Sequence, residues 1–139
     1  MTTQSIMRPR GQAVAEVAIA ITILAFVMVL AIQFAMLGSA MLALNQVTYQ
    51  AARYAAVNQG ASQSTVYSYM LSVGSPTITS KGGANLSMSL SPATTPRAAF
   101  STVTVSSTLN AKSFIVIPNP FLGVKLPTTL TATESAMVE

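Results

Sequence analysis

The dominant pattern in the chain is a long apolar run near its N-terminus. Apart from Thr22, Gln33 and Ser39, the residues from Val17 to Leu44 are apolar, and this run contains no proline. About 20 apolar residues in a helix span the hydrocarbon core of a bilayer, so a run of 28 residues is long enough. The pattern predicts a single transmembrane helix.

The predicted helix continues beyond the apolar run. Residues 45–58 contain neither glycine nor proline and are rich in alanine, and Gly60 provides a stop signal. A helix over residues 13–59 would be roughly 70 Å long at 1.5 Å per residue, which exceeds the thickness of a bilayer. We therefore predict a transmembrane helix at 12–44 and an extramembrane helical stem at 45–60.

Shorter elements are predicted after Gly60. A short helix is expected at 61–71. Four later segments alternate between apolar and polar residues, at 86–90, 101–105, 113–117 and 130–138. This period is typical of strands with one buried face. The order predicts an α+β fold, in which residues 61–139 form a small β-rich outer domain whose antiparallel sheet packs on the stem. Docking on the stem or on neighbouring subunits would enlarge its thin core.

Charge changes this picture by its scarcity. Only 7% of the 139 residues are charged, against about 25% in an average soluble domain. The seven bases give a net charge of +4 but are scattered, so they do not indicate a nucleic-acid groove. Arg8 and Arg10 directly precede the apolar run. The positive-inside tendency therefore predicts a cytoplasmic N-terminus and an outer domain on the opposite side of the membrane.

The missing residue types exclude several kinds of chemistry. The chain contains no His, Cys, Trp or Asp. Metal sites built on His or Cys, a His-assisted nucleophile and a disulfide framework are therefore excluded. An acid–base carboxylate pair would require Glu16 and Glu134 to meet, because the remaining acid is the C-terminal Glu139. We predict a protein that is not an enzyme and that uses no cofactor, no metal, no nucleic acid and no small-molecule substrate.

Two features of the helix leave alternatives open. A basic leader before an apolar helix also describes a secretory signal peptide, but the run exceeds the usual 7–15 residues and resembles a cleavage site only at 38–40, which favours a retained anchor. Arg53 either points into solvent or pairs with Glu134 or the chain terminus. The solvated interpretation is favoured, since it is the usual one for a lone charge.

A ridge of small side chains predicts where the helix packs against other helices. These residues recur every four positions, as Ala31, Ala35, Ser39 and Ala43. Small residues at this spacing let membrane helices approach closely. The ridge could continue through Val47, Ala51 and Ala55. Because alanine is abundant throughout the helix, a chance pattern is the alternative.

Glu16 is the one acid at the membrane edge. Carrying a carboxylate to the bilayer centre costs about 2.5–3.5 kcal/mol. In one interpretation Glu16 stays at the interface, where it favours the N-terminal end of the helix dipole. The other rests on a resemblance, because Gly11, four residues and then Glu16 look like the type IV prepilin processing motif. The basic leader and the apolar helix directly after it strengthen this likeness.

The chain resembles one family of pilin-like proteins. Residues 10–16 (RGQAVAE) and 51–57 (AARYAAV) are similar to the TadE family of bacterial tight-adherence (Flp-type) pilus systems, and residues 131–139 resemble the end of that family. Two positions depart from several Flp-type prepilins, which carry phenylalanine in place of Gln12 and an aromatic residue in place of Val17. The resemblance covers residues 8–59 and, more loosely, the final strand, and it implies a pilin-like fold.

The resemblance also implies a maturation step and a set of partners. A prepilin peptidase would cut between Gly11 and Gln12 and remove the leader 1–11. Glu16 would then compensate the N-terminal amine of a neighbouring subunit during assembly, since paired charges are tolerated in an apolar setting. The chain would be a bacterial inner-membrane pilin or minor pseudopilin. It would associate with other pilin subunits, itself included, through the N-terminal helix and enter an extracellular pilus for adhesion or secretion. The competing hypothesis is an unprocessed single-span protein whose outer domain binds a partner.

Overall fold

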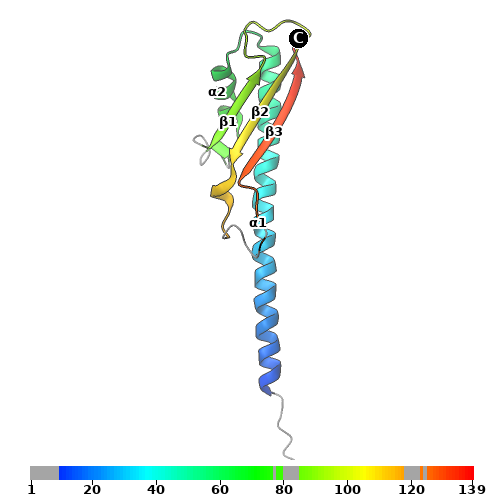
Figure 1. The fold of residues 1–139 in the computed structure, drawn as a ribbon, viewed down its shortest axis with the longest axis vertical. Coiled ribbons are helices and arrows are strands. Elements are labelled where there is room, and N and C mark those ends of the chain that lie inside the picture. The colour runs from blue at the N-terminus through cyan, green and yellow to red at the C-terminus, as the bar shows by residue number, and fades with distance from the viewer. Residues whose placement is uncertain (1–9, 77, 80–84, 118–122, 124) are drawn as a thin grey trace, which may run out of the picture.

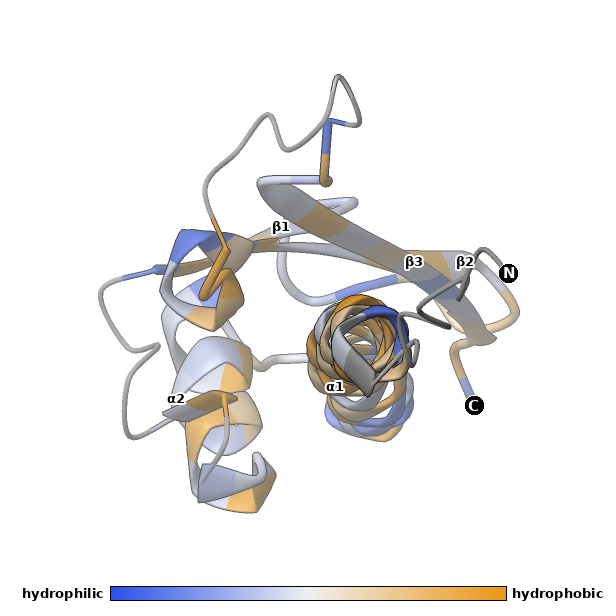
Figure 2. Ribbon diagram, turned by 90° about the horizontal axis from the view of Figure 1, so that it is seen from below, coloured by the Kyte–Doolittle hydropathy of each residue, from blue (hydrophilic) through white to orange (hydrophobic). Residues whose placement is uncertain are grey.

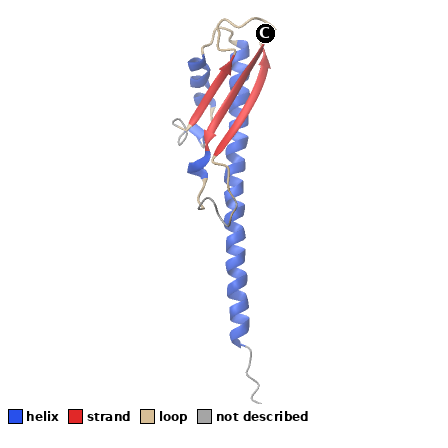
Figure 3. Ribbon diagram, in the orientation of Figure 1, coloured by secondary structure: helices blue, strands red, loops and turns tan. Residues whose placement is uncertain are grey.

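The computed structural model of the chain describes residues 10–76, 78–79, 85–117, 123 and 125–139. A long helix α1 (Arg10–Val57) is followed by a shorter helix α2 (Gln63–Val73). Strands β1 (Leu86–Ser91) and β2 (Thr102–Asn110), the 3₁₀ helix η1 (Ala111–Phe114) and strand β3 (Thr129–Met137) complete the order. The three strands lie side by side along one half of α1 (Figure 1, Figure 3). The predicted α+β class, a long apolar helix followed by a small antiparallel sheet, is confirmed.

Helix α1 has 48 residues and divides into a bare half and a covered half. Residues 11–32 are all exposed apart from Phe26 and Leu30, which are half-buried. From Gln33 onward, one side of the helix is covered by the outer domain. The helix ends at Val57, two residues before the predicted end at 59, and Asn58 and Gly60 follow its last turn. The outer domain thus rests on part of the predicted 12–44 membrane segment as well as on the 45–60 stem.

The sheet has the order β1-β2-β3, and both pairs are antiparallel. Its inner face supplies six of the buried apolar side chains larger than alanine, and half of the buried residues of α1 are alanine. The buried residues of this face are Leu86, Leu90, Val103, Val105, Ser107, Leu109, Leu130 and Ala132. Viewed along α1, the sheet covers one side of the helix and α2 lies beside it (Figure 2). One shared core therefore joins helix and sheet.

The covered side of α1 follows a repeat of three and four residues. Its fully buried members are Gln33, Leu37, Ala40, Leu44, Val47, Thr48, Ala51, Ala52, Ala55 and Ala56. Steps of alternating three and four residues average close to the 3.6-residue turn, so this row stays under the sheet over six turns. The Thr48 hydroxyl donates to the Leu44 carbonyl at 2.7 Å, which satisfies it inside the core.

Helix α2 closes the core on the side of the edge strand β1. Its Val66 and Met70 are fully buried, and the ring of Tyr69 stacks on that of Tyr54 in α1 at a centroid distance of 4.1 Å. The side chain of Ser62 caps the helix by accepting from the Thr65 amide. The short helix predicted at 61–71 is therefore present, displaced by two residues.

The strand predicted at 113–117 is wrong, and the sheet has three strands. Strand β2 continues to Asn110 instead of ending at the predicted residue 105, and η1 follows directly after it. Asn110 causes this turn, because its side-chain oxygen accepts from the Lys112 amide at 3.1 Å. The backbone beyond η1 bonds to a side chain of α1 instead of a neighbouring strand. Strand β3 therefore pairs directly with β2, with Asn110 opposite Thr129.

Candidate processing and assembly site

Gly11 and Gln12 lie in the first turn of α1, and the rest of the predicted leader, residues 1–9, lies outside the described residues. A Cβ atom built on Gly11 would meet no other atom within 4 Å. Gly11 also lacks a positive φ, the other structural reason for a glycine. Neither packing nor backbone conformation in the monomer therefore requires glycine at this position.

Glu16 is exposed on the same helix, about one turn after Gln12. The Gln12 side-chain amide donates to the Glu16 carboxylate at 3.2 Å. The donor is a neutral amide on the surface, so this contact does not compensate the negative charge of Glu16. A carboxylate on an apolar helix needs a cationic partner once water is removed, because an unpaired charge is costly there. The geometry leaves Glu16 able to take such a partner from another molecule.

The two acids that a carboxylate pair would need are far apart. Glu134 is half-buried on the inner face of β3, opposite Val105 in the register. Glu16 lies 17 residues before Gln33, the first fully buried residue of α1, or roughly 25 Å along the axis. The structure does not bring them together. No cluster of three or more acidic, His or Cys residues that could hold a metal occurs among the residues described.

The ridge of small residues changes character along the helix. Ala31, Ala35 and Ser39 are exposed, whereas Ala43 is half-buried against the core. Its proposed continuation is wrong, because Val47, Ala51 and Ala55 are buried within the same molecule. The reason is geometric. Each step of four residues advances 400°, so such a row drifts about 40° per step around the helix. Only the lower part of the ridge faces outward.

Arg53 is exposed, in agreement with the favoured interpretation. Among the arginines whose side chains the structure describes, Arg97 is the buried one, at only 2% exposed. Its Nη1 donates to the carbonyl of Ala55 at 3.0 Å and reaches those of Asn58 and Gln59 at 3.3 and 3.4 Å. Its Nη2 donates to the Ala61 carbonyl at 2.8 Å. One guanidinium thus caps the C-terminal end of α1, whose last carbonyls lack intrahelical partners.

Sequence reasoning missed Arg97 because its partners are backbone atoms. A cation near a helix C-terminus also interacts favourably with the helix dipole, and the last turn of α1 contains no basic residue of its own. The absence of a basic residue in this last turn is the one signal in the sequence that a base from another part of the chain caps the helix. It does not indicate which of the distant bases fills the position.

A second side-chain tie fixes the lower end of the outer domain. Gln33 is 2% exposed, and its Nε2 donates to the Phe114 carbonyl at 2.8 Å. Its Oε1 accepts from the Val116 amide at 2.9 Å. The other two polar residues of the apolar run bond within their own helix, Thr22 to the Ala18 carbonyl and Ser39 to the Met36 carbonyl. Each polar group in the run therefore has a partner that does not depend on water.

The outer face of the sheet is a second feature that sequence reasoning did not assign. Three complete rows of hydroxyl side chains cross the strands in register, namely Ser87–Thr108–Thr131, Ser89–Ser106–Thr133 and Ser91–Thr104–Ser135. The Thr104 and Ser135 hydroxyls lie 2.9 Å apart, and those of Ser106 and Thr133 lie 3.1 Å apart. Nine of the 26 Ser and Thr residues in 61–139 therefore lie in register on one uncharged face.

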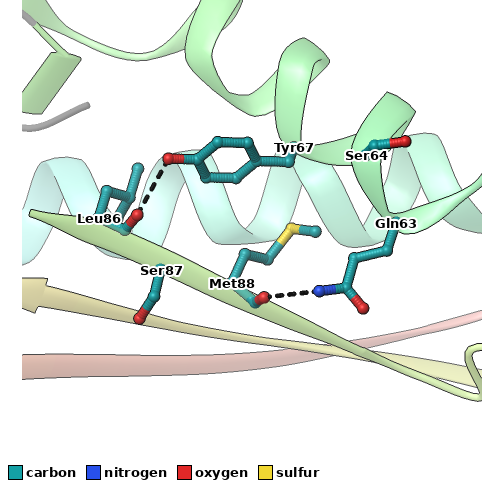
Figure 4. Close-up of a pocket in the computed structure, with 6 residues that line it drawn as sticks. All are labelled: Gln63, Ser64, Tyr67, Leu86, Ser87 and Met88. Carbon is teal, nitrogen blue, oxygen red and sulfur yellow. Dashed lines mark hydrogen bonds between the residues drawn. The ribbon is translucent and has the colours of Figure 1, made fainter. Parts of the chain in front are cut away.

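A shallow groove of about 500 Å³ separates α2 from the free edge of β1. Figure 4 shows two side chains of α2 crossing it. The Tyr67 hydroxyl donates to the Leu86 carbonyl at 3.0 Å, and the Gln63 amide donates to the Met88 carbonyl at 3.0 Å. These bonds occupy backbone acceptors that an added strand would use, so α2 protects this edge of the sheet from pairing.

The chain was compared with protein-family models, with curated proteins and with solved structures, and none of the three comparisons finds a match. Within the described residues, α1 is the one helix long and apolar enough to cross a membrane, and it lies near the N-terminus. The candidate site is thus the junction of Gly11, Gln12 and Glu16 at the start of a membrane-length helix.

Proposed function

We propose that the chain is a TadE-like pilin or minor pseudopilin of the bacterial inner membrane. In this proposal α1 spans the membrane once, with the outer domain outside the cytoplasm. A prepilin peptidase cuts between Gly11 and Gln12, and the mature chain joins other pilin subunits in a tight-adherence-type pilus used for adhesion or secretion. The protein acts by assembly rather than by catalysis.

The observation that carries the proposal is an exposed Glu16 on the bare half of α1, whose carboxylate, among the described residues, bonds only the neutral amide of Gln12. Residues 11–32, of which all but Phe26 and Leu30 are exposed and most are apolar, form the end of a helix whose other end is covered by the sheet. In a filament of such helices the carboxylate would lie among apolar side chains, and the free amine of a cleaved Gln12 in a neighbouring subunit would compensate it. The exposed lower ridge of Ala31, Ala35 and Ser39 would let the helices approach closely.

Processing is tested by N-terminal sequencing of the protein from membranes of cells that contain an active prepilin peptidase. The wild type should begin at Gln12. Gly11→Ala should leave the precursor in the membrane, and the fold should be unchanged because the added Cβ meets no neighbour. The matched control is Gly38→Ala, which makes the same change in the same helix, also without a clash, and should be processed normally. An intact wild-type precursor beside an active peptidase would support the unprocessed single-span alternative.

Assembly is tested separately with Glu16→Ala. Removing the carboxylate should leave insertion and cleavage intact and should reduce the amount of protein recovered in sheared pili. Unchanged incorporation of this variant would remove the assembly role of Glu16, whatever the result of the processing experiment.

A further inference from the structure

The base of the outer domain carries an exposed apolar tip. Phe114, at the end of η1, is buried, and Ile115 and Ile117 are half-buried, but Val116 between them is 74% exposed. We call residues 115–117 the base loop. Lys112, which precedes it, is also exposed. An exposed valine among isoleucines at the end of a domain has no role in the core that the sheet shares with α1.

The level of the base loop along α1 is fixed by Gln33. The buried Gln33 amide bonds the backbone on both sides of Ile115, through the Phe114 carbonyl and the Val116 N–H. In Figure 1 the segment after η1 accordingly lies beside α1 at the lower end of the outer domain. Because both bonds go to backbone atoms, the Val116 side chain can be replaced without breaking the tie.

That level coincides with the expected edge of the membrane. Residues 11–32 of α1 measure roughly 33 Å at 1.5 Å per residue, and the hydrocarbon core of a bilayer is about 30 Å thick. The first residue above this segment is Gln33. Phe34, on the helix just above it, is also exposed, so the apolar surface of α1 continues up to the level of the base loop. This step rests on the proposed membrane span.

We infer that the base loop is a second membrane contact, in which Val116 enters the outer leaflet beside α1. The partner of the base loop is the lipid interface. An apolar tip inserts into this interface while nearby cations remain at the phosphates of the lipid headgroups. Lys112 and Lys125, both exposed, are the cations closest to the base loop in sequence. A single helix can rotate about its own axis in a bilayer. A second contact beside it fixes that rotation and so determines which face of α1 neighbouring helices meet.

Tryptophan provides a direct test, because the natural chain contains none. Three single-tryptophan variants of the full chain would be reconstituted in phosphatidylcholine vesicles with and without brominated acyl chains. Val116→Trp reports on the base loop, and Val27→Trp reports on the bare half of α1. Phe100→Trp is the matched exposed control, since Phe100 is 82% exposed and its backbone bonds to Val138 at the far end of the domain.

The inference requires that brominated lipid quench the tryptophans at 27 and 116 and leave the one at 100 unchanged. Aqueous iodide should give the reverse order. Quenching at 27 without quenching at 116 would overturn the membrane contact of the base loop and leave the span intact. Absence of quenching at 27 would overturn the span and the base-loop contact with it. Equal lipid quenching at 100 and 116 would also overturn the inference, because it would show no preference for the base.

Discussion

At the scale of single residues, two long polar side chains hold the outer domain to α1. Arg97 bonds the carbonyls at the C-terminal end of the helix, and Gln33 bonds the backbone after η1. Both are buried, and both bond to main-chain atoms. Removing one of these side chains is costly, because its buried backbone partner then has no hydrogen bond and cannot reach water.

The Arg97 tie predicts a large effect from one substitution. Arg97→Leu should destabilise the outer domain by about 2–4 kcal/mol, because it leaves one buried and three partly buried carbonyls without this donor. Arg97→Lys should recover only part of this, since an ammonium cannot reproduce the planar fork of donors. Arg53→Leu is the matched control and should change stability by less than about 0.5 kcal/mol, as Arg53 is exposed. Urea unfolding followed by tyrosine fluorescence in detergent measures all three. Equal effects at 53 and 97 would contradict the tie.

At the scale of elements, α1 presents different faces to different partners. The buried row lies under the sheet, and the ridge of small residues drifts away from it toward the N-terminus. The exposed part of the ridge, at Ala31, Ala35 and Ser39, is therefore available to another helix. The ridge residues beyond Ala43 are buried within the monomer and cannot contact another helix.

Enlarging the exposed ridge should weaken helix association. Ala35→Leu should weaken self-association in bicelles severalfold, because the larger side chain keeps the helices from approaching closely. Ala18→Leu makes the same change about 100° around the helix and should have little effect. Resonance energy transfer between labelled copies gives the association constants. If both variants associate as the wild type does, the ridge is not an interface.

The sequence correctly predicted the elements whose patterns are local. It did not predict the structure of segments whose conformation depends on residues far away in the chain. The helix and the alternation in β1, β2 and β3 follow from side chains close together in the chain. The segment 113–117 also alternates, but the Asn110 side chain turns the backbone and Gln33 binds it from 81 residues away. For the candidate site, Gly11, Gln12 and Glu16 could be found because they form a contiguous motif. Arg97 could not, because no pattern near it indicates the end of α1.

At the scale of the whole molecule, the outer domain and the covered half of α1 form one folding unit. The buried row begins at Gln33, so the unit includes 12 residues, 33–44, of the predicted membrane segment. The apolar run therefore has two environments. Its first part is bare and its last part belongs to the core of the outer domain.

Two truncations distinguish this unit from a domain that begins at the predicted stem. A fragment starting at Ile32 keeps every buried residue of α1 and should fold cooperatively in mild detergent. A fragment starting at Asn45 loses Leu37 and Leu44, each worth about 1.5–3 kcal/mol when fully buried. Their sum is a large share of the total stability of about 5–15 kcal/mol for a small domain. Thermal melts by circular dichroism compare the two. Equal melting temperatures would place the boundary of the unit at the stem.

The positions of Arg97 and Gln33 have a mechanical consequence. They attach opposite ends of the outer domain to one helix, at points 22 residues apart between Gln33 and Ala55, roughly 33 Å. A pull on the distal tip, with the lower part of α1 held, acts along the helix axis. It therefore loads both attachments and the core between them together, in shear, instead of peeling the sheet from one end. The two attachments and the core between them therefore resist tension along the length of the molecule together.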